Sequence, residues 1–172
     1  MSTNDILLRW NQLPKAAAAE EILPCCGSRA WAREMTAARP FEDVATLLAT
    51  SDRIWLALGT ADWLEAFQSH PRIGETRGHR KSSARSQQWS AQEQSRATES
   101  PEAVKQALAQ GNREYERKFG RIFIICASGK SALDILGGLQ HRLGNDDATE
   151  LREAAEQQRQ IVQIRVKKWL TE

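Results

Sequence analysis

The sequence has few of the features that mark secreted or membrane proteins. It contains only three cysteines among its 172 residues, and two of these, Cys25 and Cys26, are adjacent, which is a poor spacing for a framework of disulfide bonds. No apolar run approaches the roughly 20 residues that a bilayer span needs. The N-terminal stretch MSTNDILLRWNQLP also lacks the basic start and the uninterrupted apolar core of a signal peptide. We therefore expect a reduced, cytoplasmic protein without a membrane partner.

An excess of charge of either sign is missing as well. The chain has 24 Lys and Arg residues and 22 Asp and Glu residues, so its formal net charge at pH 7 is only +2. This balance provides no strong attraction to nucleic acids. Hydrophobic residues make up 41% and charged residues 27% of the chain, values that are typical of a globular protein. The length allows a buried core, and we expect a single domain over residues 1–172.

Motifs for metals and nucleotides are absent too. His70, His79 and His141 are far apart, and neither an HExxH nor a CxxC spacing occurs, so no metal ligands are expected. The stretch FIICASGKS at 123–131 ends in the Gly-Lys-Ser of a phosphate-binding loop. That motif also requires a glycine at position 124, where this chain has Ile124, so the cradle for a phosphate is missing. Cys126 lies in the same apolar stretch, where a thiol is usually inert packing.

The sequence does contain recurrent helical punctuation, which predicts an all-α, multi-helix bundle. A helix that Thr60 caps must stop at His70, because the following Pro71 disfavours helical geometry before it. Ser90 and Glu93 have the spacing of a capping box at the start of a helix. The expected helices cover about 5–13, 16–24, 40–48 (with Pro40 in the first turn), 60–70, a segment from 90, 101–120 and 147–169.

Two segments do not fit this helical pattern. Residues 76–88, TRGHRKSSARSQQ, have almost no apolar side chains and predict a surface loop. Residues 122–127, IFIICA, have the propensity of a short buried strand, although periodicity alone does not decide between strand and helix. One strand among so many helices leaves the all-α assignment unchanged.

Arg165 falls inside the apolar stripe of the last expected helix. Two interpretations are open. In the first, the stem is buried and the guanidinium reaches water. In the second, the guanidinium faces a site in which an anion or a polar ligand meets it. The stripe is formed by Leu151, Ala155, Gln158, Val162 and Trp169.

His70 and Glu93 each have a structural and a catalytic interpretation. An imidazolium at a helix C-terminus is stabilised by the helix dipole, so His70 could be a cap. The same dipole favours the protonated form, which is a proton donor near neutral pH. Glu93 either completes the capping box with Ser90 or serves a site. The residues alone do not name a reaction.

Five motifs, in this order, resemble those of one enzyme family. They are SHPRIGE at 69–75, WSAQEQS at 89–95, N-x-x-Y-x-x-x-FG at 112–120, FIICA at 123–127 and I-x-x-x-R at 161–165, and ARPF at 38–41 fits as well. Together they resemble the OHCU decarboxylases, the 2-oxo-4-hydroxy-4-carboxy-5-ureidoimidazoline decarboxylases of urate breakdown. The resemblance covers nearly the whole chain.

The resemblance implies a cofactor-free enzyme that removes CO2 from OHCU to give (S)-allantoin. It implies an all-helical, commonly homodimeric protein, in which 122–127 is a core-anchored loop whose backbone faces the ligand. Carried onto this chain, it makes His70 the proton donor and Arg165 a C-terminal arginine at the site. We predict that His70, Glu93 and Arg165 are the catalytic residues. The implied substrate-contacting residues are Pro71, Ser90, Ala91, Gln92, Glu93, Gln94, Phe123, Ile124, Ile125, Cys126 and Ala127.

A different class of function remains as the alternative. The chain could be a non-catalytic helical module that binds a purine-like ligand or RNA through the basic 76–88 loop. Nucleic-acid affinity would then fall steeply with salt. Within the enzyme interpretation, the sequence leaves open whether Glu93 is a base or only holds the substrate.

Overall fold

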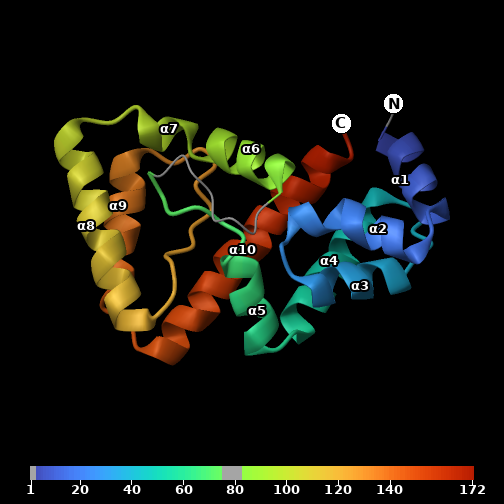
Figure 1. Cartoon of the computed structure of the whole chain (residues 1–172), viewed down its shortest axis with the longest axis horizontal. Helices are drawn as coiled ribbons and strands as arrows, with labels where there is room; N and C mark the ends of the chain where they lie inside the picture. Colours follow the sequence, from blue (N-terminus) through green and yellow to red (C-terminus); the bar gives the residue numbers. More distant parts are fainter. Residues whose placement is uncertain (1–2, 75–82) are drawn as a thin grey trace. The chain divides into compact units, whose positions relative to one another are not determined.

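The computed structural model describes residues 3–74 and 83–172, and every regular element in these ranges is helical (Figure 1). The predicted all-α class is therefore confirmed. No helix in the described ranges is both long enough and apolar enough to cross a membrane. The elements are α1 Thr3–Gln12, α2 Lys15–Ile22, η1 Leu23–Cys25, α3 Arg29–Ala37, α4 Val44–Ala57, α5 Thr60–Phe67, α6 Ala84–Glu93, α7 Ser95–Thr98, α8 Glu102–Phe119, α9 Ala132–Arg142 and α10 Asp147–Trp169.

The chain divides into two compact units. The first comprises Met1–Ala66 and Arg159–Glu172, and the second comprises Phe67–Gln158. The backbone passes from one unit to the other within α5 and again within α10. The assignment of 1–172 to one domain stays a prediction.

The first unit is built around buried tryptophans whose indole N–H groups are hydrogen bonded. Trp10 donates to the carbonyl oxygen of Ala18 at 2.9 Å, and its ring meets the ring of Trp169 edge-on at 5.5 Å between centroids. The C-terminal half of α10 is held to α4 by polar contacts, because Arg159 and Gln163 each bind the Asp52 carboxylate at 2.7 Å. Burying large rings with their polar atoms satisfied stabilises this core.

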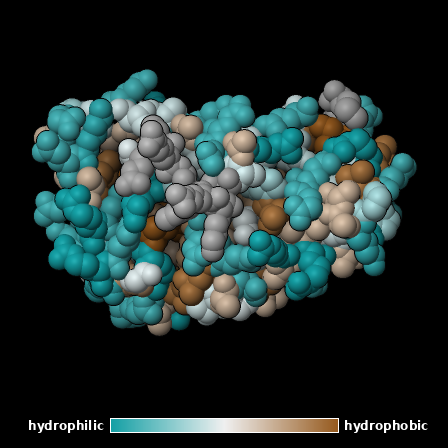
Figure 2. Space-filling view, in the orientation of Figure 1, coloured by the Kyte–Doolittle hydropathy of each residue, from teal (hydrophilic) through white to brown (hydrophobic). Residues whose placement is uncertain are grey.

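The second unit has its core between α8 and α9, which lie side by side (Figure 1). Their close approach requires Gly111, because a Cβ atom at that position would lie 2.6 Å from a methyl carbon of Leu139. Helix α8 ends at Gly120, whose φ of 66° is left-handed, as the sequence predicted. Hydrophilic residues cover most of the visible surface over α8 (Figure 2). The core includes Tyr115, Phe119, Phe123, Ile125 and Ile135.

The predicted capping box at Ser90 and Glu93 is wrong, and so is part of the predicted 76–88 loop. Helix α6 starts at Ala84 and has Ser83 as its N-cap, whose Oγ accepts the N–H of Ser86 at 3.1 Å. Ser90 lies in the last turn of this helix. The first turns of α6 contain almost no apolar residues, so periodicity gave no helical signal there. The rest of the predicted loop, 76–82, lies outside the described residues.

Two further predictions, a helix that begins at Pro40 and a strand at 122–127, are wrong, and two helices were not predicted. Pro40 follows a cis peptide bond and lies outside α4, which starts after its N-cap Asp43, whose carboxylate accepts the N–H of Thr46 at 2.7 Å. Helices α3 and α9 were not predicted, although each has a serine N-cap, Ser28 and Ser131 respectively. The predicted strand at 122–127 is also wrong, because this segment has no regular secondary structure.

Candidate active site

His70 stands just beyond the end of α5, as the proline that follows it predicted. Helix α5 ends at Phe67, and the backbone N–H of His70 donates to the carbonyl oxygen of Phe67 at 3.2 Å. The imidazole is only 6% exposed, and its Nε2 atom is buried. A buried ring that is held in place can deliver a proton in one direction, which is what a general acid requires.

The segment that follows His70 is fixed by side chains from α8 and from the end of α6. Arg72 forms a two-bond ion pair with Glu116, with Nη2 at 2.9 Å from Oε2 and Nε at 2.5 Å from Oε1. Asn112 donates from Nδ2 to the carbonyl oxygen of Ile73 at 3.0 Å. The N–H of Gly74 donates to Oε1 of Gln94 at 3.1 Å. These contacts immobilise the backbone that carries His70.

The predicted substrate-contacting residues 90–94 lie at the C-terminal end of α6. Ser90 and Gln94 are buried, Glu93 is half-buried, and Ala91 and Gln92 are exposed. The Gln94 side chain accepts a hydrogen bond from the Gly74 backbone and thereby connects this helix end to the segment that follows His70. Contact of these residues with a substrate stays a prediction.

The second predicted segment, 123–127, is buried, and side chains bind its backbone. Arg142 donates from Nη1 to the carbonyl oxygen of Ile124 at 2.7 Å, and the N–H of Cys126 donates to Oε1 of Gln157 at 2.9 Å. Lys130 donates from Nζ to the carbonyl oxygen of Cys126 at 2.6 Å. Buried backbone N–H and C=O groups need hydrogen-bond partners. In this segment side chains provide them in place of a neighbouring strand.

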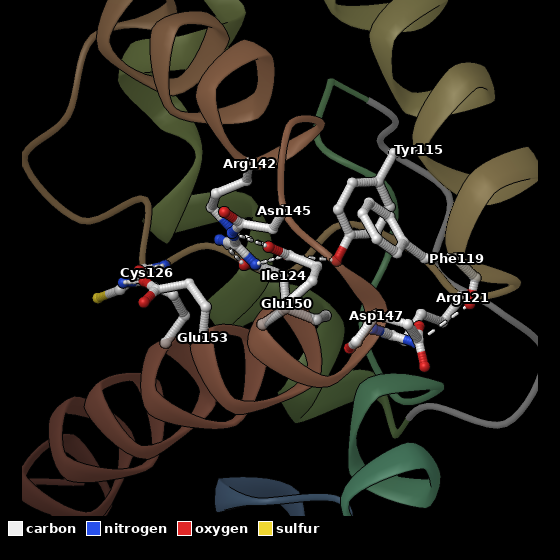
Figure 3. Close-up of polar contacts among 11 residues, drawn as sticks. Tyr115, Phe119, Arg121, Ile124, Cys126, Arg142, Asn145, Asp147, Glu150 and Glu153 are labelled. Atoms are coloured by element: carbon white, nitrogen blue, oxygen red, sulfur yellow. Dashed lines mark hydrogen bonds and ion pairs between the residues drawn. The ribbon is translucent and has the colours of Figure 1, made fainter.

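A buried cluster of polar side chains contacts the 123–127 segment through Arg142 (Figure 3). The Glu150 carboxylate is fully buried and accepts hydrogen bonds from Arg142, from Asn145 and, at 2.5 Å, from the Tyr115 hydroxyl. Burial, together with the hydrogen bond to Glu150, raises the pKa of the Tyr115 phenol. The phenol therefore stays a neutral donor to the carboxylate across the physiological pH range.

Arg165 is completely buried, so the interpretation in which its guanidinium reaches water is wrong. It belongs to the first unit, where its Nη1 donates to the carbonyl oxygen of Pro24 at 3.4 Å. Its charge also acts on Cys26, although burial dominates there and raises the pKa of the thiol to about 12. Cys26 therefore remains a neutral thiol, while the expected encounter of Arg165 with a ligand stays a prediction.

The second unit thus contains every predicted site residue except Arg165. His70, Pro71, 90–94 and 123–127 all belong to Phe67–Gln158, whereas Arg165 belongs to the first unit. Sequence reasoning missed the residues that hold these segments, although Asn112 and Tyr115 stood in a motif that it singled out. In the parts of the chain that are described, no group of His, Cys, Asp and Glu side chains is arranged to hold a metal ion.

A cavity of about 450 Å³ in the second unit lies against the segment that follows His70. Its wall includes Arg72, Ile73 and Gly74, and the remaining lining comes from α7 and α8. None of the predicted catalytic or substrate-contacting residues lines it. The cavity therefore lies beside the candidate site rather than in it.

Comparisons with known proteins agree in one family. The sequence model of the OHCU decarboxylase family matches residues 11–167. The uric acid degradation bifunctional protein TTL of Arabidopsis thaliana is 38% identical over 151 residues, which is 87% of this chain and 46% of the relative, so the chain spans about half the length of that protein.

Similar solved structures include the following two. The crystal structure of OHCU decarboxylase in the presence of (S)-allantoin has a TM-score of 0.77 at 35% identity, over 89% of this chain and 99% of that one. The crystal structure of (S)-allantoin synthase has a TM-score of 0.69 at 18% identity, over 98% of this chain and 54% of that one, and it is similar in fold alone.

Proposed function

We propose that this chain, which belongs to the OHCU decarboxylase family, removes CO2 from OHCU to give (S)-allantoin. The observation that carries the proposal is the placement of His70. Its buried imidazole stands at the end of α5, on a backbone that α8 and Gln94 hold in place. The same unit contains both segments that the family resemblance assigns to the substrate.

The chemistry of the substrate explains why fixed protein groups suffice. When the bond to the carboxylate breaks, its electron pair moves into the ring, where the C=N bond accepts it. The ring nitrogen that received the electron pair takes up a proton, which leaves an enol. The enol hydroxyl then loses its proton and becomes a carbonyl, while a proton adds to the ureido-bearing carbon and creates the stereocentre of allantoin. The protein contributes orientation, exclusion of water and delivery of the proton to one face.

In this proposal the three catalytic residues have different roles. His70 is the proton donor. Glu93, which is half-buried at the end of α6, orients His70 or binds the substrate hydroxyl. Arg165 binds ureido or ring oxygens, because a tight grip on the departing carboxylate would stabilise the ground state over the transition state. The backbone of 123–127 and the end of α6 orient the ring.

The proposal is tested by adding a catalytic amount of the protein to freshly generated OHCU and following its disappearance by ultraviolet absorbance. The proposal expects loss of OHCU at a rate proportional to protein concentration, over many turnovers. A rate that does not change with the amount of protein would contradict it.

The quaternary structure and the location belong to the same proposal. The family resemblance supports a homodimer, and light scattering on the purified protein would then give twice the chain mass of 19.3 kDa. The cysteine usage supports a cytoplasmic protein, which cell fractionation tests directly. A mass of one chain, or recovery from a membrane or secreted fraction, would contradict these two statements.

A further inference from the structure

The 123–127 segment has an irregular conformation that depends on side chains from α9 and α10. Arg142 contacts this segment twice. Its Nη1 donates to the carbonyl oxygen of Ile124 at 2.7 Å, and its guanidinium carbon lies 4.5 Å from the centre of the Phe123 ring. Arg142 is itself 6% exposed, so both contacts are shielded from water.

Glu150 determines where that guanidinium points. Its Oε1 accepts from Nε of Arg142 at 2.9 Å and from Nη2 at 2.5 Å. A guanidinium is a rigid planar fork. Once Nε and Nη2 are fixed on the carboxylate, the direction of the Nη1–H bonds is fixed as well, and that direction meets the Ile124 carbonyl.

The Glu150 carboxylate is in turn held by two neutral donors. The Tyr115 hydroxyl of α8 donates to Oε1 at 2.5 Å, and Nδ2 of Asn145 donates to Oε2 at 2.9 Å. Figure 3 shows these side chains converging on Glu150. The carboxylate is 0% exposed, so each of these contacts acts in a medium of low dielectric constant. The direction of Arg142 is therefore determined by three different parts of the second unit.

We infer that Arg142, oriented by Glu150, is a positioning residue for the reaction, which holds the 123–127 backbone in the conformation that contacts the substrate. This inference rests on the proposed function, since the family resemblance assigns substrate contact to 123–127. Arg142 acts through the Ile124 carbonyl and the Phe123 ring and does not touch the substrate. Tyr115 and Asn145 act one step further away, through Glu150.

The test compares Arg142→Lys with Leu108→Ala. Lysine keeps the charge, but its single nitrogen cannot hold Glu150 and Ile124 in the geometry of the fork. Leu108 is a 2% exposed hydrocarbon on α8 in the same core, so its truncation lowers the melting temperature without removing a hydrogen bond to the segment. We expect Arg142→Lys to raise both KM for OHCU and Kd for (S)-allantoin by at least about tenfold, because a displaced segment binds both ligands less well. Leu108→Ala should leave both constants unchanged.

Four outcomes decide between the possibilities. Wild-type KM and Kd in Arg142→Lys overturn the inference, and so does an equal rise of KM in Leu108→Ala, which would assign the effect to lost stability. Wild-type protein that neither converts OHCU nor binds (S)-allantoin overturns the proposed function instead. Hydrogen exchange of the Cys126 amide separates the two failures, since Arg142→Lys should accelerate it at least about tenfold relative to both other proteins. Unchanged exchange overturns the inference whatever the activity.

Discussion

Asn112 of α8 donates its side-chain amide hydrogen to the backbone carbonyl oxygen of Ile73 at 3.0 Å. Both residues are 6% exposed, and Ile73 stands three positions after His70. The contact therefore connects a long helix of the second unit to the segment that carries the proposed proton donor. A buried carbonyl that loses a hydrogen-bond donor must either move or be left less well satisfied.

Asn112→Ala is expected to destabilise the protein by about 1–3 kcal/mol, because the Ile73 carbonyl then has no donor at that place. It should also lower kcat, since the His70 backbone gains freedom. Urea denaturation and steady-state kinetics measure the two effects. Gln110→Ala is the control, because Gln110 is exposed on the same helix and donates its side-chain amide hydrogen to Glu114 of that helix. Equal stability and kcat in both variants would remove Asn112 from this account.

His70→Ala is expected to fold and to lose turnover by ~10²–10⁴-fold, which is the typical cost of removing an acid–base group. Circular dichroism and thermal melting establish the fold, and OHCU consumption establishes the rate. If the variant keeps a near-native rate and only melts at a lower temperature, His70 ends the helix α5 and has no catalytic role.

Glu93→Gln is expected to leave the melting temperature nearly unchanged and to lower the rate at least about tenfold, which corresponds to roughly 1.4 kcal/mol of barrier. Glu93 is the last residue of α6, whereas a capping box lies at the start of a helix, so Glu93 has no role in one. Glu99→Gln is the matched control, because Glu99 is exposed just beyond α7 in the same unit. A Glu93→Gln enzyme with wild-type turnover would leave His70 as the only assigned acid–base group.

Exhaustive chelation and dialysis are expected to leave the activity unchanged. The reason is that no cluster of His, Cys, Asp and Glu in the described ranges can hold a metal ion, and the ring of the substrate itself accepts the electron pair. OHCU consumption before and after treatment measures this. An activity that disappears on chelation and returns with a divalent cation would show that the reaction needs a metal.

The sequence predicted those parts of the fold in which local signals and tertiary structure agree. Helix α8 begins after Pro101 and ends at Gly120, and α10 runs from Asp147 to Trp169, as their punctuation indicated. Helix α6 was misplaced because its first turns lack apolar residues, and Ser90 resembled a cap while standing in the last turn. A local pattern does not distinguish a capping serine from an interior one.

The candidate site was predictable in its motifs but not in the contacts that support them. The apolar residues of 123–127 have high strand propensity, yet Arg142, Gln157 and Lys130 satisfy the backbone in place of a neighbouring strand. Those partners are specified by tertiary structure alone. The complete burial of Glu150 was likewise not predicted, because an acidic residue in the first turn of a helix carries no local sign of burial.

The most direct test of the proposed function is the optical activity of the allantoin that forms from freshly generated OHCU. A proton delivered by His70 reaches one face of the ring, whereas protonation by water in solution reaches both. Circular dichroism during the reaction should therefore show (S)-allantoin accumulating in the presence of the protein, and racemic allantoin in the presence of His70→Ala. Racemic product with the wild-type protein would contradict the account.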